Sequence, residues 1–260
     1  MLEINSKTNK TYKMLSALHA KKGRQEHGLY TVEGLKSVQE ALDAAAAIQL
    51  LVVTKAFAQT HPSLLKRAEN NGASLCCLDE DLFAKISDTK TPAGVLCTIK
   101  LPQHSLPALK HGLYIYCDHI ADPGNAGTII RTADAVGANA VLFSPECVDI
   151  YNPKVIRSTM GSFFHIETYT DVNAAILTQA KAQGFRTVAG ALTPSATDAR
   201  EITLPHDTVL VIGNESNGIS ASVLEICETH AILPIAGKAE SLNAAAAAAV
   251  FMYKWLFEQK

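Results

Sequence analysis

The sequence predicts an α/β protein in which strands and helices alternate along nearly the whole chain. Short apolar runs alternate with longer segments whose apolar residues recur at helical spacing. Of the 260 residues, 48% are hydrophobic and 18% are charged, so the chain can bury a large core. The repeated strand–helix units favour a mostly parallel sheet that is covered by helices on both faces.

The composition divides the chain into two domains. Residues 101–112 hold two prolines and a glycine but no long apolar run, which is typical of a linker. We therefore expect one domain in residues 1–105 and a second domain in residues 106–260. The length of the chain suits two domains of ordinary size.

The first domain is expected to be a small α/β sandwich. Its first helix follows from Tyr12, Leu15 and Leu18, which recur at helical spacing, and a later helix ends at Asn71-Gly72. Its strands are short apolar runs between turn residues. The expected helices cover residues 8–22, 34–46, 62–70 and 79–86, and the expected strands cover residues 29–33, 48–54, 75–78 and 94–99.

The second domain repeats the strand–helix unit more regularly, and ligands of such sheets bind at the carboxyl ends of the strands. Its expected strands cover residues 112–117, 140–143, 164–168, 186–191, 209–213 and 231–235. Its expected helices cover residues 125–136, 154–160, 172–183, 219–227 and 241–257.

The charges are unevenly distributed along the chain. The formal net charge is −2, which argues against a uniformly basic nucleic-acid binder. Residues 1–36, however, hold seven Lys and Arg residues and only three Glu residues. We therefore predict a local basic face whose contacts with phosphates weaken as the salt concentration rises.

Several other classes of protein are excluded. No apolar run reaches about 18 residues without charges, so we expect no transmembrane helix, and we do not expect the polar, basic N-terminus to act as a secretory signal. The six cysteines show no C-x-x-C spacing, so we expect them to be reduced and packed as small hydrophobic residues in a cytoplasmic protein. The sequence also lacks the P-loop, G-x-G-x-x-G, H-E-x-x-H and G-x-S-x-G motifs.

A first polar segment, residues 122–133, follows the first strand of the second domain. Asn125 and Arg131 lie six positions apart, so a helix does not place them on one face. Arg131 follows Ile129 and Ile130, and a charge among apolar residues must reach a partner or a cleft. The alternative interpretation is a helix cap followed by a surface arginine.

A second segment, residues 209–219, takes a buried strand directly into a glycine-bearing turn. Backbone amides in such a turn can approach a ligand closely. Glu215 would lie at the carboxyl end of the strand, where sites occur. The alternative interpretation is an ordinary turn between a strand and a helix.

A third segment, residues 233–243, precedes six alanines at positions 244–249. Ser241 is expected to cap the helix that follows, because its hydroxyl can accept hydrogen bonds from free amides. The alanines let a ligand or another backbone approach closely. The alternative interpretation is a tightly packed helix without a functional role.

In this order and at these distances, the three segments resemble the three motifs of the SpoU/TrmH group of RNA ribose 2′-O-methyltransferases, in the wider SPOUT class. The matching residues are Asn125 and Arg131, then Gly213, Glu215 and Gly218, then Pro234, Gly237, Ser241, Leu242 and Asn243. A further segment of this chain resembles the stretch that the family has between its first two motifs. It comprises Tyr151-Asn152-Pro153-Lys154 with Arg157, Ser158 and Gly161. The first domain resembles the small L30e-like RNA-binding domain that often precedes the catalytic domain in this family. The matching residues are Arg24 with Tyr30, Val32, Glu33 and Gly34.

The resemblance implies an α/β knot for the second domain, with a deep trefoil knot, which is a rare exception to unknotted folds. It also implies S-adenosylmethionine as the cofactor, no metal, no membrane, and a homodimer whose active sites are shared between subunits. The implied cofactor-binding residues are Gly190, Ala191, Leu192, Gly213, Leu233, Ile235, Leu242 and Asn243. The implied RNA-binding cations are Lys7, Lys10, Lys13, Lys21, Lys22, Arg24, Lys154 and Arg157. In one departure, residues 244–246 are alanines where the family often has Val-Ser-Val.

The residues to which the resemblance gives catalytic roles are Arg131, Asn125, Glu215, Ser241 and Asn243. A ribose 2′-hydroxyl is a poor nucleophile, so it needs a base and alignment with the donor methyl group. The family role of Arg131 is to activate that hydroxyl, although an arginine is hard to deprotonate. The alternative is that Arg131 stays cationic and clamps a phosphate, while that phosphate or water takes the proton. Asn125 would orient the ribose or Arg131, Glu215 would hold either side chain, and Ser241 and Asn243 would fix the donor side.

We therefore expect an S-adenosylmethionine-dependent RNA 2′-O-ribose methyltransferase that acts on ribosomal RNA of the 23S type. The alternatives are a methyltransferase for transfer RNA and a non-catalytic RNA-binding protein of the same fold. A nucleotide-cofactor oxidoreductase is disfavoured, because the dinucleotide motif is missing.

Overall fold

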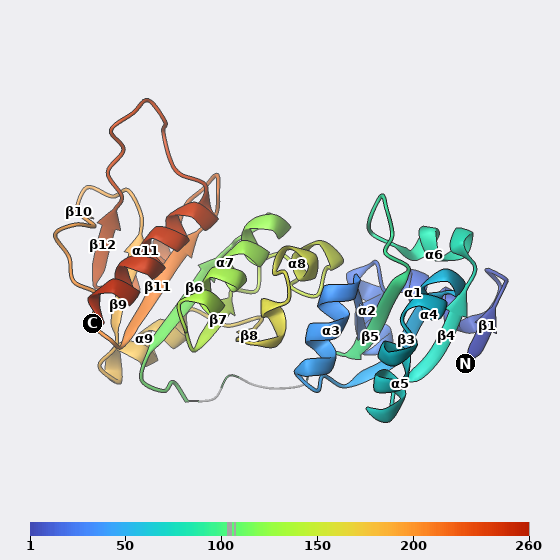
Figure 1. Ribbon diagram of the computed structural model, residues 1–260. Coiled ribbons are helices and arrows are strands. Elements are labelled where there is room, and N and C mark those ends of the chain that lie inside the picture. The colour runs from blue at the N-terminus through green and yellow to red at the C-terminus, as the bar shows by residue number, and fades with distance from the viewer. Residues whose placement is uncertain (103–105, 107, 260) are drawn as a thin grey trace. The chain divides into compact units, whose positions relative to one another are not determined.

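The computed structural model describes residues 1–102, 106 and 108–259, which form two compact units (Figure 1). The first unit combines Met1–His104 with Tyr151–Phe164, and the second combines Ser105–Ile150 with His165–Lys260. The domain boundary expected near residue 105 falls at residues 103–105, outside the described part of the chain.

The first unit includes residues 151–164, whereas the sequence predicts them in the second domain. Aromatic packing explains this grouping. The ring of Tyr30 lies 5.0 Å from that of Tyr151 and 6.0 Å from that of Phe163, centroid to centroid. Such offset and edge-to-face pairs add stability beyond the area that they bury.

The first unit contains a five-stranded mixed sheet. Its strands lie in the order β1 (Leu2–Ile4), β4 (Ser74–Leu78), β3 (Ile48–Thr54), β5 (Val95–Lys100) and β2 (Leu29–Glu33). β1, β4 and β3 run parallel, and β5 is antiparallel to both of its neighbours. The helices are α1 (Lys10–Ala17), α2 (Lys21–His27), α3 (Leu35–Asp43), α4 (Lys55–Thr60), α5 (Pro62–Asn70), α6 (Glu80–Ile86) and α8 (Pro153–Ser158), with a 3₁₀ turn, η1 (Ser162–Phe164).

The helix expected over residues 8–22 is two helices, α1 and α2, with a break at Ala20. Ala20 has an extended backbone, with φ −95° and ψ 143°. A Cβ atom at Gly23 would lie 2.0 Å from the carbonyl oxygen of Ala17, so only glycine lets α2 approach the end of α1 this closely. The periodicity of apolar residues does not indicate this close approach. The sequence also does not predict β1 and α4.

The second unit contains a seven-stranded sheet in which all neighbouring strands are parallel. Its order is β10 (Thr197–Asp198), β12 (Thr229–Ile232), β9 (Arg186–Gly190), β11 (Thr208–Gly213), β6 (Leu113–Asp118), β7 (Ala140–Phe143) and β8 (Glu167–Tyr169). The carboxyl ends of all these strands therefore meet at one edge. The trefoil knot implied by the resemblance stays a prediction.

Helices cover both faces of this sheet (Figure 1). On one face, α9 (Ala175–Ala182) and α10 (Ala221–Ile226) bury Leu177 and Val223 against Tyr116 and Val211. On the other face lie α7 (Pro123–Ala135) and α11 (Ala244–Glu258), which pack against each other. The Cys117 and Cys227 thiols belong to this core, and burial raises the pKa of Cys227 to about 12.

The long C-terminal helix begins at Ala244, three residues later than expected. Its cap is Asn243, whose Oδ1 accepts hydrogen bonds from the amides of Ala245 (3.0 Å) and Ala246 (3.2 Å). The expectation that Ser241 caps this helix is therefore wrong. Serine and asparagine are both good caps. Asn243 differs from Ser241 in that its Nδ2 also donates a hydrogen bond to Asn125 of α7.

All six cysteines are free thiols, and five of them are buried. None of the described helices is both long and apolar enough to cross a membrane.

Candidate active site at the carboxyl ends of the parallel strands

Asn125 joins the three motif segments. Its Nδ2 donates to Glu215 Oε1 over 2.6 Å, and its Oδ1 accepts from Asn243 Nδ2 over 2.8 Å. Positions 125, 215 and 243 are far apart in the sequence, yet their side chains form one chain of hydrogen bonds. The sequence placed these three residues in one site, and the structure brings them together.

The orientation of each amide in this chain is fixed by its partners. Asn243 Oδ1 caps α11, so its Nδ2 is free to donate to Asn125. Asn125 Oδ1 must then accept, which turns its Nδ2 toward the Glu215 carboxylate. Asn125 itself is 8% exposed in the first turn of α7, where Asp122 Oδ1 accepts its backbone amide over 2.8 Å. The network is therefore ordered by helix capping before any ligand arrives.

A closed turn presents Glu215 at the end of β11. Asn214 and Gly218 exchange both backbone hydrogen bonds, at 2.9 and 3.0 Å. A Cβ atom at Gly213 would lie 2.4 Å from the carbonyl carbon of Gly218, so this position requires glycine. Gly213 thus shapes the turn, and Glu215 is left exposed at its tip.

Arg131 does not join this network. Its side chain is exposed on α7 and has no hydrogen bond or ion pair within the described residues. The cation is therefore free to meet a substrate or a second subunit. Cys117, the residue before the last of β6, is fully buried, and burial holds its pKa well above its ordinary value, so it stays a protonated thiol.

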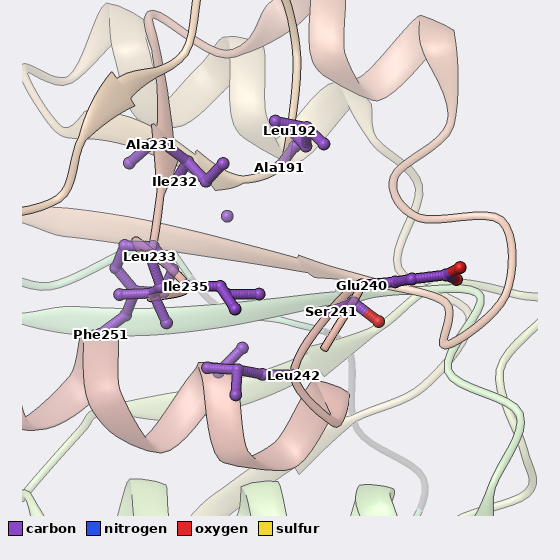
Figure 2. A pocket seen from close by; sticks show the side chains of 12 residues that line it. Ala191, Leu192, Ala231, Ile232, Leu233, Ile235, Glu240, Ser241, Leu242 and Phe251 are labelled. Atoms are coloured by element: carbon purple, nitrogen blue, oxygen red, sulfur yellow. The ribbon is translucent and has the colours of Figure 1, made fainter. Parts of the chain in front are cut away.

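A pocket opens beside the network, at the ends of β9 and β12 (Figure 2). Its volume is about 160 Å³, and its walls are mostly apolar. The lining residues are Gly190, Ala191, Leu192, Ala231, Ile232, Leu233, Ile235, Glu240, Ser241, Leu242, Ala247 and Phe251. Six predicted cofactor positions lie here, whereas Gly213 and Asn243 do not; Ser241, expected among the catalytic residues, lines the pocket instead.

Residues 112–253 match the SpoU rRNA Methylase family. The chain belongs to this family. Residues 9–97 match the MRM3-like substrate binding domain. The predicted family, fold class and enzyme class, an S-adenosylmethionine-dependent RNA methyltransferase, are thereby confirmed.

Relatives named as rRNA methyltransferases align with nearly the whole length of this chain. The 23S rRNA (guanosine(2553)-2'-O)-methyltransferase RlmP of Bacillus subtilis is 34% identical over 97% of this chain and 98% of its own length. The 23S rRNA (uridine(2479)-2'-O)-methyltransferase of Streptomyces viridochromogenes is 25% identical over 96% and 90%. The AdoMet-bound rRNA methyltransferase from Sinorhizobium meliloti superposes with a TM-score of 0.87, at 30% identity, over 97% of this chain and 96% of that one.

The pocket of this SpoU-family chain fits S-adenosylmethionine chemically. Leu192, Leu242 and Ile235 line it although they are 79%, 44% and 39% exposed, so a flat apolar group such as a purine would bury surface that water now covers. Figure 2 shows the Glu240 carboxylate and the Ser241 hydroxyl on one side of the pocket, where polar parts of a ligand would bind. A Cβ atom at Gly190 would lie 2.9 Å from the Phe251 ring, so glycine keeps this wall open.

The predicted RNA-binding cations include one error. Arg24 is 3% exposed, and its guanidinium donates to the carbonyl oxygens of Leu18 (2.7 Å) and His19 (2.9 Å). It therefore satisfies the end of α1 and does not face solvent. Arg157 is exposed but forms an ion pair with Asp88 at 2.6 Å. The other predicted cations, which are all exposed, are Lys7, Lys10, Lys13, Lys21, Lys22 and Lys154.

Two further residues, Asp118 and Asn214, brace the site and do not belong to the predicted set. Asp118, the last residue of β6, is 2% exposed, and its Oδ2 accepts the amide of Ser220 over 2.7 Å. Asn214 Nδ2 donates to the carbonyl oxygen of His119 over 2.8 Å. An acidic residue that ends an apolar strand was a usable signal for Asp118, because a buried carboxylate needs donors.

Proposed function

We propose that this SpoU-family chain transfers the methyl group of S-adenosylmethionine to a ribose 2′-hydroxyl of 23S-type ribosomal RNA. The hydrogen-bonded chain Asn243–Asn125–Glu215, next to an apolar pocket, is the observation that carries this proposal. The Bacillus and Streptomyces relatives act on 23S rRNA, one at a guanosine and the other at a uridine. The proposal therefore names the RNA class and leaves the base open.

The cofactor supplies a methyl group on a positively charged sulfur, so no metal is required. Leu192, Ile235 and Leu242 bury the apolar part of the donor, and Glu240 with Ser241 binds its polar part. The pre-ordered Asn125 amide and the Glu215 carboxylate orient the ribose. The Arg131 guanidinium binds the phosphate beside the reacting hydroxyl. The proton of that hydroxyl passes to the phosphate or to water.

The proposed assembly is a homodimer formed through α11 and α7. Three apolar side chains recur at helical spacing on the outer face of α11. They are Val250, Tyr253 and Phe257, which are 48%, 40% and 63% exposed. A second copy would cover this stripe and bring its surface to the exposed Arg131 on the neighbouring α7. Light scattering should give a dimeric mass for the wild type and a monomeric mass for Val250→Lys/Phe257→Lys; a monomeric wild type contradicts the assembly.

Methyl transfer from tritiated S-adenosylmethionine tests the function directly. We expect incorporation into 23S rRNA transcripts, no incorporation into transfer RNA, and a block to alkaline cleavage at the labelled nucleotide, because the 2′-oxygen is methylated. Arg131→Ala should abolish incorporation, whereas Lys181→Ala, on the far side of the sheet, should not. Label in transfer RNA or in a base would overturn the proposal, and RNA binding without transfer would favour the non-catalytic alternative. The cytoplasmic location stays a prediction.

A further inference from the structure

A short segment between β9 and β10 forms one wall of the pocket. β9 ends at Gly190 and β10 begins at Thr197, so residues 191–196 connect them. Ala191 and Leu192 line the pocket from this segment. Because Leu192 is 79% exposed, its side chain does little to hold the segment against the protein. The amide of Ala191 donates to the carbonyl oxygen of Ala231 over 3.0 Å, which holds only the start of the segment, so the rest of this wall needs further contacts.

The polar side chains of the segment converge on one histidine. Thr193 Oγ1 lies 2.9 Å from His230 Nδ1, and Ser195 Oγ lies 3.4 Å from the same nitrogen. The two hydroxyl oxygens are 3.3 Å apart. Within the segment, the amide of Ala196 donates to the carbonyl oxygen of Thr193 over 3.0 Å and closes a turn. The Thr193 hydroxyl makes the short bond to the imidazole, and the Ser195 hydroxyl lies within reach of both groups.

The other ring nitrogen of His230 fixes the direction of these bonds. His230 Nε2 lies 3.0 Å from the carbonyl oxygen of Leu224, which can only accept. In the neutral ring Nε2 therefore carries the hydrogen, and Nδ1 is the acceptor for the Thr193 hydroxyl. His230 belongs to β12, directly before Ala231 and Ile232 of the pocket lining. The ring thus links the end of α10 to the pocket wall.

We propose that Thr193, Ser195 and His230 are positioning residues that hold residues 191–196 in the conformation that completes the cofactor pocket. This inference rests on the proposal that the pocket binds S-adenosylmethionine. A wall that is already ordered costs less conformational entropy when the ligand binds than a wall that must be ordered by it. Loss of the Thr193 bond should therefore weaken cofactor binding, while Asn125 and Glu215, which lie on other segments, keep their contacts.

Calorimetry with S-adenosylmethionine and with S-adenosylhomocysteine tests this inference in the full-length protein. Thr193→Val removes the hydroxyl but keeps the shape, and we expect it to raise both dissociation constants by about threefold to tenfold. Thr193→Ser, which keeps the hydroxyl, should bind as the wild type does. Thr178→Val, at an exposed position of α9, is the matched control. The KM for S-adenosylmethionine should rise in Thr193→Val relative to the KM for RNA, a split that a general loss of stability would not produce.

Hydrogen exchange in the cofactor-free protein gives a readout that does not depend on the ligand. The amides of residues 192–196 should exchange faster in Thr193→Val than in the wild type, and Thr193→Ser should restore their protection. Equal exchange and equal affinity in Thr193→Val and the wild type would overturn the inference. If the wild type binds no S-adenosylmethionine, the proposed function fails, and the exchange comparison alone decides whether His230 holds the segment.

Discussion

Two regions at the carboxyl ends of the same sheet are held in opposite ways. The polar region, Asn125 with Glu215 and Asn243, is closed by hydrogen bonds of 2.6 and 2.8 Å, and Asn125 is buried at its centre. The apolar pocket beside it is open, and Leu192 and Leu242 in its lining are 79% and 44% exposed. The groups that orient a substrate are thus fixed in advance, whereas the donor pocket still exposes surface that a ligand would bury.

This difference has a physical reason. An amide or carboxylate speeds a reaction only if it need not reorganise when charge develops, so it must be held by its own partners beforehand. An apolar wall gains its binding energy at the moment when water leaves it. We therefore expect changes in the polar region to lower the rate of transfer, and changes in the pocket to lower the affinity for the donor.

The largest expected effect is that of Asn125→Ala on the rate of transfer. Without this side chain, Asn243 Nδ2 and Glu215 lose their common partner, and the reacting groups lose their alignment. We expect the single-turnover rate of methyl transfer to fall by about a hundredfold, while the dissociation constant for S-adenosylmethionine changes by less than about twofold. Rapid-quench measurements give the rate of methyl transfer, and calorimetry gives the dissociation constant for S-adenosylmethionine.

Gln179→Ala serves as the control for Asn125→Ala, because it removes an exposed amide from α9. It should leave both quantities as they are in the wild type. A donor affinity that falls as much as the rate in Asn125→Ala would show that the two regions act as one.

Ala247→Phe should give the opposite pattern, with a smaller effect. Ala247 lines the pocket from α11, so a phenyl ring there would occupy space meant for the donor. We expect the dissociation constant for S-adenosylmethionine to rise by about tenfold, with the rate at saturating donor closer to that of the wild type. Calorimetry measures the first quantity, and Ala56→Phe, exposed on α4, controls for the added ring. An unchanged affinity would mean that the donor binds elsewhere.

Much of this comparison could be predicted from the sequence. The alternation of strands and helices indicated the parallel sheet, and the three motif segments named Asn125, Glu215 and Asn243 before their contacts were known. Motif residues are found in this way because the chemistry requires a given side chain at a given place. The apolar positions of the pocket were implied by the resemblance to the family, and six of the eight implied cofactor positions line it.

The remaining features depend on contacts between distant segments, to which local patterns are blind. Ser241 and Asn243 are equally good helix caps in the sequence, and only the bond from Asn243 to Asn125 distinguishes them. Arg24 is typical of a surface cation until Gly23 allows α2 to approach α1 and bury it. His230 lies 37 positions from Thr193, and no spacing rule connects them.

The smallest expected effect comes from the amino end of β11, the end opposite Glu215, and it should concern stability alone. There Asp207 accepts hydrogen bonds from His111 (2.6 Å), His206 (3.0 Å) and the amide of Gly112 (2.9 Å). Burial by itself would raise the pKa of Asp207, but these bonds outweigh it and lower the pKa to about 2.

The pKa of Asp207 determines how Asp207→Asn should depend on pH. In the unfolded chain an aspartate has a pKa of about 3.9. The carboxylate therefore stabilises the fold above that pH, and this contribution is lost as the pH falls toward 2. Because the partners are largely exposed, we expect Asp207→Asn to lower the free energy of unfolding by less than about 1 kcal/mol at pH 6, and the gap to close below pH 3. Urea unfolding across this range measures it. A loss of methyl transfer in the folded variant would contradict the separation of the two ends of β11, since Asp207 lies far along the strand from the network that orients the ribose.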